Sequence, residues 1–248
     1  LLEIGMMRQK RRILPHVYYI NDQQVLFEHM HVLGYLMFAS EHAPGKPEVK
    51  QADWLKLLLR TGLYPFTLTY IRSLSPAEYV IVSALLAYMS SAVLVVMDLS
   101  RISIPERLIA PFSALLKELT DAGKTVVITN ASRAFVQRAC THASFLMDGT
   151  IRASDSVEAL CTAFDKHILS VDSPAPEKAL SALTAAFAGL RIAHNEGTLR
   201  IYGEGDAAKA CTISGAADVL GRAGVPVTEI RVPAPSLEEA FQEVRRTL

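Results

Sequence analysis

The sequence has few cysteines, no long uninterrupted hydrophobic segment and no excess of charge of either sign. Its three cysteines, Cys140, Cys161 and Cys211, are widely spaced and form no CxxC pair, which is typical of buried thiols in a reducing compartment and excludes a disulfide framework. Lysine and arginine total 25, as do aspartate and glutamate, so the formal net charge is zero. A neutral chain has no field with which to hold a phosphate backbone, and nucleic-acid binding is therefore not expected.

The apolar segments are short as well. Residues 79–89 and 92–97 are separated by Ser90 and Ser91, and neither approaches the roughly 20 residues that span a bilayer. Hydrophobic residues nevertheless make up 50% of the 248 residues, and the mean hydropathy is +0.24, so the chain has ample material for a buried core. At about 150 residues per domain, this length predicts one large domain or two modest ones.

Continuous apolar strands alternate with helices through residues 1–165. Strands are predicted at residues 16–20, 92–97 and 125–129, and helices at residues 53–61, 76–88, 105–120 and 132–140. Ser75 and Pro76 give the second helix an N-cap and a proline in its first turn. Strands that are apolar throughout predict a parallel sheet covered on both faces. Asp98 ends the second strand, so it should lie at the carboxyl edge of the sheet, where α/β folds keep their ligand sites.

The pattern changes towards the C-terminal end. Asp148 and Gly149 predict the turn of a hairpin at residues 143–151. Beyond residue 165 the predicted elements follow one another as β-α-β-β-α-β, which favours a small α+β domain of ferredoxin-like type. We therefore expect two domains, an α/β domain over residues 1–165 and an α+β accessory domain over residues 166–248.

Several short segments follow one another in a recognisable order. They are residues 19–27 (YINDQQVLF), 74–78 (LSPAE), 93–98 (VLVVMD), 125–131 (TVVITNA), 145–151 (FLMDGTI) and 235–241 (PSLEEAF). In this order they resemble the Gln-loop entry, the LSGGQ signature, the Walker B strand, the strand before the switch histidine, the closing hairpin and the C-terminal extension of ABC-transporter nucleotide-binding subunits of the exporter branch. The resemblance covers nearly all of the chain. It implies a partial ABC-type ATPase domain with a parallel sheet, helices on both of its faces and a helical subdomain.

No segment of the sequence matches the phosphate-binding loop of that family. Such a loop needs glycines between a strand and a helix, followed by lysine and a hydroxyl residue. The end of the motif is matched by Gly123, Lys124 and Thr125. These residues, however, follow a predicted helix and precede a predicted strand, which is the reverse of the order in a P-loop. Gly5 is the only glycine before Asp22. The chain is therefore expected to lack the Walker A region.

Residue by residue, the resemblance implies that the hydrolytic groups are lost. Asp98 matches the Walker B carboxylate and would be the ligand if Mg²⁺ is bound, but Leu99 replaces the carboxylate that orients the attacking water. Ala131 stands at the switch histidine and Pro105 at the aspartate of the D-loop. Asp22 takes the place of the Gln-loop glutamine. No catalytic residue is expected to be intact, and Leu99 and Ala131 are the degenerate positions.

The signature is altered too. In the family, its amides face the γ-phosphate of a nucleotide held by the opposite subunit. Pro76 has no N–H and Ala77 adds a methyl group, so this contact is weakened, while Ser75 remains as an anion contact or as a plain N-cap. The vestigial nucleotide-binding positions that the resemblance implies are Asp22, Leu74, Ser75, Glu78 and Asp98.

Three functions stay open at this point. The first is a catalytically degenerate ABC subunit, a pseudo-ATPase, that couples a partner ATPase to a membrane permease for export and lies peripherally at the cytoplasmic face of the membrane. Its partners would be an ABC permease and a second ABC ATPase subunit, and ATP with Mg²⁺ would bind only together with that subunit. The second is a fragment of an active ABC ATPase whose N-terminal Walker A part is absent from this chain, although Leu99 and Ala131 count against it. The third is a stand-alone scaffold or binding module that uses the C-terminal domain.

Overall fold

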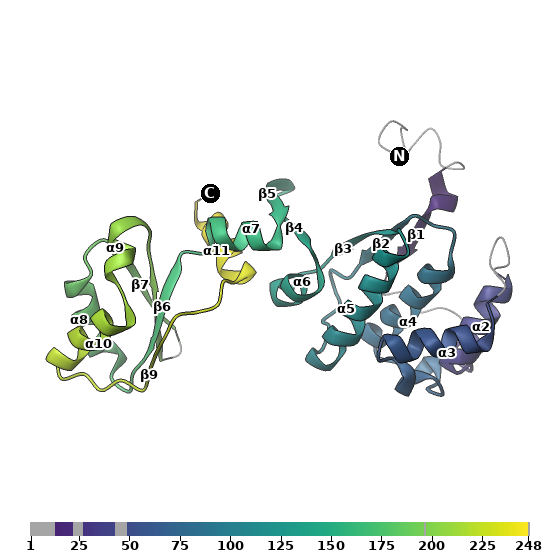
Figure 1. The fold of residues 1–248 in the computed structure, drawn as a ribbon, viewed down its shortest axis with the longest axis horizontal. Coiled ribbons are helices and arrows are strands. Elements are labelled where there is room, and N and C mark those ends of the chain that lie inside the picture. The colour runs from purple at the N-terminus through teal and green to yellow at the C-terminus, as the bar shows by residue number, and fades with distance from the viewer. Residues whose placement is uncertain (1–12, 22–26, 43–48, 196, 248) are drawn as a thin grey trace. The chain divides into compact units, whose positions relative to one another are not determined.

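The computed structural model describes residues 13–21, 27–42, 49–195 and 197–247 (Figure 1). The chain divides into two compact units, Leu1–Cys140 and Thr141–Leu248. The first combines a parallel sheet with helices, and the second combines antiparallel strands with helices. The mixed α/β fold class predicted from the sequence is confirmed.

A parallel sheet organises the first unit. Among the described residues it has three strands in the order β1 (Val17–Ile20), β2 (Leu94–Asp98) and β3 (Thr125–Thr129). Leu94 lies opposite Val17 on one side and opposite Thr125 on the other. Helix α4 (Pro76–Met89) leads from the helical region into β2, and α5 (Glu106–Asp121) connects β2 with β3. The predicted strands are therefore confirmed, with shifts of a residue or two at their ends.

The segment between β1 and α4 is largely helical. It contains α2 (Val32–His42), α3 (Gln51–Arg60) and 3₁₀ turns at Tyr64–Phe66 and Ile71–Ser73, and a further 3₁₀ turn at Leu14–His16 precedes β1. Helix α6 (Arg133–Ala139) follows β3. One hydrophobic core joins these helices to the sheet, with Trp54 of α3, Phe112 of α5 and Phe135 of α6 fully buried in it.

Helices cover one face of this sheet in the part of the chain that the structure describes. Val95 and Met97 of β2 point into the helical core and are buried. On the opposite face Tyr19 is 57% exposed and Val127 48% exposed. The predicted cover on both faces thus holds for one face only. The periodicity of an apolar strand reports that both faces are apolar, and it does not report what lies against them.

The second unit begins with the predicted hairpin. Strand β4 (His142–Met147) pairs with β5 (Thr150–Ser156) in the antiparallel sense. Asp148 has φ of 49° and Gly149 φ of 74°, as the two central residues of a type I′ turn require. Helix α7 (Val157–Phe164) follows.

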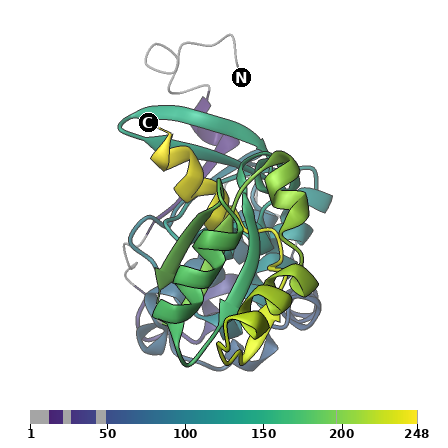
Figure 2. The ribbon, with the colours of Figure 1, turned by 90° about the vertical axis from the view of Figure 1, so that its left-hand side faces the viewer.

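A second, antiparallel sheet forms the rest of this unit. Its described strands lie in the order β7 (Arg191–Asn195), β8 (Thr198–Tyr202), β6 (His167–Asp172) and β9 (Glu229–Arg231). Helices α8 (Pro176–Ala186) and α10 (Ile213–Arg222) lie side by side on one face of the sheet (Figures 1 and 2). The short α9 (Gly205–Ala210) precedes α10 and interrupts the predicted β-α-β-β-α-β order; α11 (Leu237–Arg246) ends the chain. Assignment to the ferredoxin-like class stays a prediction.

The compact units do not divide at the predicted residue 165. That position lies inside the second unit, between α7 and β6. The hairpin and α7 pack against the C-terminal helix α11, where the rings of Phe145 and Phe241 meet edge to face with their centroids 5.3 Å apart. This long-range contact holds residues 141–164 to the C-terminal part of the chain.

Candidate functional site

Asp98 lies where the sequence places it, at the carboxyl end of the central strand β2. Its Oδ1 accepts hydrogen bonds from the Thr129 hydroxyl at 2.7 Å and from the Ser100 amide at 3.2 Å. The bond from Thr129 and then those from Ser100 hold the pKa of Asp98 below its ordinary value. The carboxylate is therefore ionised at neutral pH and already has two donors.

The two positions that the resemblance predicts to be degenerate differ in their surroundings. Leu99 is 0% exposed and belongs to the hydrophobic core, while its amide donates to the Thr129 carbonyl at 2.9 Å. Ala131 lies at the exposed end of β3, and its carbonyl accepts a hydrogen bond from Arg133 Nη1. Neither side chain offers a polar atom near Asp98, so no group at these positions orients a water molecule.

Leu74, Ser75 and Glu78 lie at the start of α4, which Leu74 and Ser75 precede. Leu74 is buried, and Ser75 is the N-cap. The Ser75 hydroxyl accepts from the Glu78 amide at 3.4 Å, and the Ser75 amide donates to Glu78 Oε2 at 2.8 Å, which is a capping box. The N-cap interpretation of Ser75 is confirmed. A nucleotide contact at Ser75 stays a prediction.

An ion pair ties this helix start to the next helix. Arg107 Nη2, in the first turn of α5, donates to Glu78 Oε1 at 2.8 Å. Partial burial by itself would raise the pKa of Glu78, but the hydrogen bonds from Ser75 and the interaction with Arg107 outweigh it and lower the pKa. Since α5 begins just after Asp98, the starts of α4 and α5 lie at the same end of the sheet.

Sequence reasoning missed two polar residues at this edge, Thr129 and Asn130. Asn130 Nδ2 donates to the carbonyls of Leu99 and Ile102, at 3.1 and 3.2 Å, and so fixes the loop that follows Asp98. Thr129 ends β3 and Asn130 follows it, and the carboxyl ends of parallel strands meet at one edge, so the strand prediction itself contained the signal. Asp22, the predicted Gln-loop position, lies outside the described residues.

The Gly123-Lys124-Thr125 segment is no phosphate loop. Gly123 has φ of 81° and ends α5, and Thr125 begins β3, as the sequence predicts. Lys124 Nζ donates to the carbonyls of Ser90 and Ala92, both at 2.7 Å. Burial lowers the pKa of Lys124. This lysine therefore fastens the loop between α4 and β2.

The residues at the carboxyl edge do not fit ATP and Mg²⁺. The lysine of the GKT segment is held by carbonyls at the amino end of the strands, and at the carboxyl edge Asp98 is the one carboxylate that the resemblance places on the metal. Within the described ranges no three His, Cys, Asp or Glu side chains lie close enough together to hold a metal ion. We therefore derive no chemical step through a nucleotide here.

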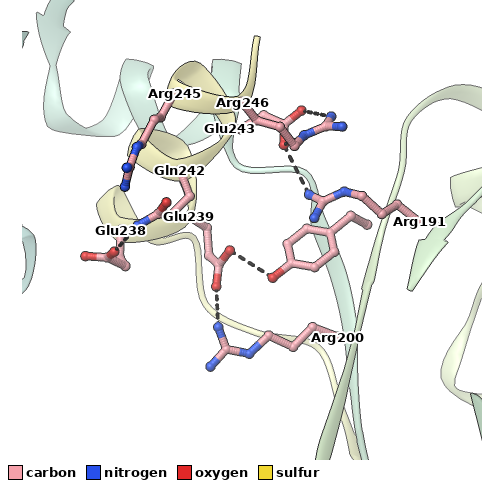
Figure 3. Close-up of a pocket in the computed structure, with 9 residues that line it drawn as sticks. Arg191, Arg200, Glu238, Glu239, Gln242, Glu243, Arg245 and Arg246 are labelled. Atoms are coloured by element: carbon pink, nitrogen blue, oxygen red, sulfur yellow. Dashed lines mark hydrogen bonds and ion pairs between the residues drawn. The ribbon is translucent and has the colours of Figure 1, made fainter. Parts of the chain in front are cut away.

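A second cluster of charged residues lies in the unit Thr141–Leu248. Arg191 of β7 and Arg200 of β8 point towards α11, where Glu243 and Glu239 face them (Figure 3). Arg191 Nη2 donates to Glu243 Oε2 at 3.1 Å, and Arg200 Nη1 donates to Glu239 Oε1 at 2.7 Å. The Tyr202 hydroxyl also donates to Glu239, at 3.0 Å. The sequence did not predict this cluster, because its members are far apart along the chain.

No protein-family model and no curated protein sequence matches the chain. Solved structures are similar to it, and two of them are ABC-transporter structures. One is an ATP-binding subunit of an ABC transporter, at 15% identity and a TM-score of 0.46, with 66% of this chain and 68% of that chain covered. The other, described as a metal-chelate type ABC transporter in an inward-facing conformation, is 16% identical at a TM-score of 0.40, with 75% and 71% covered. Both TM-scores lie below 0.5, so neither likeness carries an argument about function.

Proposed function

We propose that this chain is a catalytically degenerate ATP-binding subunit of an ABC transporter, which couples a partner ATPase to a membrane permease for export. The observation that carries the proposal is the end of β2, where a Walker B-like strand finishes on an ionised Asp98 and the next side chain, Leu99, is buried in the core. A leucine there can neither polarise water nor accept a proton. The scaffold of such a subunit persists while its hydrolytic groups are absent.

A mechanical role needs a surface for the permease, and exposed apolar side chains gather in residues 59–70. They are Leu59, Tyr64, Leu68 and Tyr70, with Leu68 the most exposed at 74%. Four large apolar side chains exposed within residues 59–70 favour an interaction surface. We propose that a permease helix packs on this segment and holds the chain peripherally at the cytoplasmic face of the membrane. None of the described helices is long and apolar enough to cross a bilayer.

The segment that carries Leu68 and Tyr70 is held in place by His31. The His31 ring stacks on the Tyr70 ring with centroids 4.0 Å apart, and its Nδ1 contacts the Leu68 carbonyl at 2.5 Å. The Arg72 guanidinium also lies over the Tyr70 ring, with its Cζ 5.1 Å from the ring centroid. A fixed apolar surface loses little conformational entropy when a partner binds, which favours a docking role.

Other apolar side chains of the helical region are unsuitable for testing this surface. Trp54 and Leu58 of α3 are fully buried. Phe27 and Leu33 are half-buried and pack against the core. A charge at these four positions would disturb folding, so exposed residues are the better probes.

The test compares how well the wild type and the Leu68→Asp variant co-purify with a permease from membranes. This variant should stay folded, because Leu68 is largely exposed, and should lose the permease from the purified complex. Leu146→Asp is the matched control, since Leu146 is 66% exposed but lies on the hairpin of the other unit. Retention of the permease by Leu68→Asp, or equal loss in both variants, contradicts the proposed surface.

The uncovered sheet face favours a second candidate, a fragment of an ABC ATPase whose Walker A part is carried elsewhere. Parallel sheets are normally buried on both faces, whereas Tyr19 and Val127 are exposed here among the described residues. If a separate polypeptide that carries the Walker A segment covers this face, adding it should raise the melting temperature of the chain. Val127→Lys should abolish that rise and leave the melting temperature of the isolated chain unchanged. If the added polypeptide has no effect, this candidate is wrong.

A further inference from the structure

Three side chains form a row across the second sheet. Ser170 of β6 lies opposite Arg200 of β8 on one side and opposite Arg231 of β9 on the other. Directly paired residues of antiparallel strands point to the same face. Their neighbours Leu169 and Val171 point to the other face and are buried in the core beneath α8 and α10. The row therefore lies on the face that these two helices leave uncovered, with its arginines about 10 Å apart at two strand spacings.

A cavity of about 330 Å³ lies over this row. The two arginines and Ser170 line it together with His167 and the segment from Val232 to Ser236, which forms an apolar wall through Val232, Pro233 and Ala234. A cavity of this size accommodates a small molecule.

The floor of the cavity is a buried hydroxyl with a hydrogen to donate. Ser170 is 4% exposed. His167 Nε2 lies 3.1 Å from the Leu169 carbonyl oxygen and 3.1 Å from Ser170 Oγ. Because a carbonyl oxygen only accepts, Nε2 carries the ring hydrogen, and Ser170 Oγ accepts from the ring as well. The hydroxyl hydrogen of Ser170 then has no acceptor in the described part of the chain and is available to a ligand. The Tyr202 ring, stacked on His167 at 5.0 Å, keeps the imidazole in this orientation.

The residues that line the cavity include two guanidiniums and one carboxylate, an excess of one positive charge within the lining itself. Glu239, the carboxylate in the lining, is engaged by Arg200 at 2.7 Å and by the Tyr202 hydroxyl at 3.0 Å. Arg231 lies 4.0 Å from Glu229, at the limit of an ion pair, and both side chains are more than half exposed. Such a contact is worth little, so the Arg231 guanidinium keeps most of its capacity for a ligand.

The neighbouring cavity, beneath α11, also has one guanidinium more than it has carboxylates among the described residues of its lining, but no serine or threonine hydroxyl there. It measures about 560 Å³ and is drawn in Figure 3. Its guanidiniums of Arg191 and Arg246 both bind Glu243, at 3.1 and 2.5 Å. Hydrogen bonds from Arg246 lower the pKa of Glu243, so this carboxylate stays ionised and holds both arginines. What distinguishes the cavity over Ser170 is the buried hydroxyl in its floor, which has a hydrogen to donate.

We propose that the cavity over Ser170 binds a small anionic molecule through a phosphate or carboxylate group. The forked guanidiniums match both groups, and charge-assisted hydrogen bonds of this kind are about twice as strong as neutral ones. Arg231 supplies the principal contact, Arg200 flanks the anion from the opposite strand, and the Ser170 hydroxyl donates from below. This site does not involve the carboxyl edge of the sheet in the other unit, so its test is independent of the proposed transport function.

The experiment is calorimetric titration of the full chain with inorganic phosphate and with citrate, at constant ionic strength. Saturable binding of at least one anion is expected. Arg231→Gln should weaken it about tenfold, which corresponds to about 1.4 kcal/mol. Ser170→Ala should weaken it by a smaller factor, because a single hydrogen bond is lost. Phosphate-only binding identifies phosphorylated molecules as the ligand class, and citrate-only binding identifies carboxylic acids.

Arg222→Gln is the control, because it removes the same charge from the exposed end of α10, a helix that packs on the other face of the sheet. It should leave the affinity unchanged within about twofold. Absence of saturable binding of either anion overturns the proposal. So does an equal loss of affinity in Arg231→Gln and Arg222→Gln, since this would show that the anion responds only to net charge. Arg231 is 55% exposed, so its replacement should not prevent folding.

Discussion

The position of Leu99 gives the sharpest prediction about the first unit, because it decides whether the residue after Asp98 faces the core or the candidate site. Leu99 is 0% exposed and packs in the same core as Trp54 and Phe112. Truncating a buried leucine to alanine removes its transfer free energy and leaves a cavity, at a total of about 2–5 kcal/mol. Leu99→Ala should therefore lower the free energy of unfolding by about that amount.

The assay is urea unfolding followed by tryptophan fluorescence. Trp54 is the only tryptophan of the chain and is fully buried, so its emission reports the unfolding of the first unit. Val127→Ala serves as the control, since Val127 belongs to the same sheet but is 48% exposed, and it should cost less than about 1 kcal/mol. If Leu99→Ala costs no more than Val127→Ala, the leucine does not pack in the core, and the argument that a core side chain has replaced the catalytic carboxylate is refuted.

Three more predictions concern the first unit and use the same fluorescence assay. Ser75→Ala should destabilise the unit by about 1 kcal/mol, because the N-cap of α4 is lost; an unchanged midpoint would contradict the capping box. The pKa of Glu78 is lowered in the folded state from 4.5, so its stabilisation is present above that pH and is lost as the pH falls through the folded pKa. The stability difference between the wild type and Glu78→Gln should therefore be largest near neutral pH and shrink in acid, and a constant difference would exclude an ionic role. Lys124→Met leaves the carbonyls of Ser90 and Ala92 without their donor and should cost about 1–3 kcal/mol; a cost near zero would mean that water replaces the lysine.

Local signals made much of the fold predictable. The N-cap at Ser75 and the proline after it set the start of α4. Asp148 and Gly149 determined a hairpin turn, because both central positions of a type I′ turn need positive φ. Asp98 was placed correctly, since an apolar strand that ends on a polar residue puts this residue at the edge of the sheet. Each of these features depends on residues within a few positions of one another.

Features that depend on distant contacts were not predictable in this way. The hairpin and α7 belong with α11, through Phe145 and Phe241, and no local pattern reveals that packing. The row of Arg200, Ser170 and Arg231 exists only because of the register of three strands. Register depends on the whole sheet, so the second cluster of candidate functional residues emerged only from the structure.

The central claim, that the scaffold persists without the groups for hydrolysis, is tested most directly by measuring ATP turnover. The full chain, purified without a partner, should hydrolyse no ATP above background in the presence of Mg²⁺, because Leu99 and Ala131 offer no polar side chain and Lys124 is bound by carbonyls. Asp98→Asn should then give the same background rate. A Mg²⁺-dependent turnover in the wild type that disappears in Asp98→Asn would contradict the account.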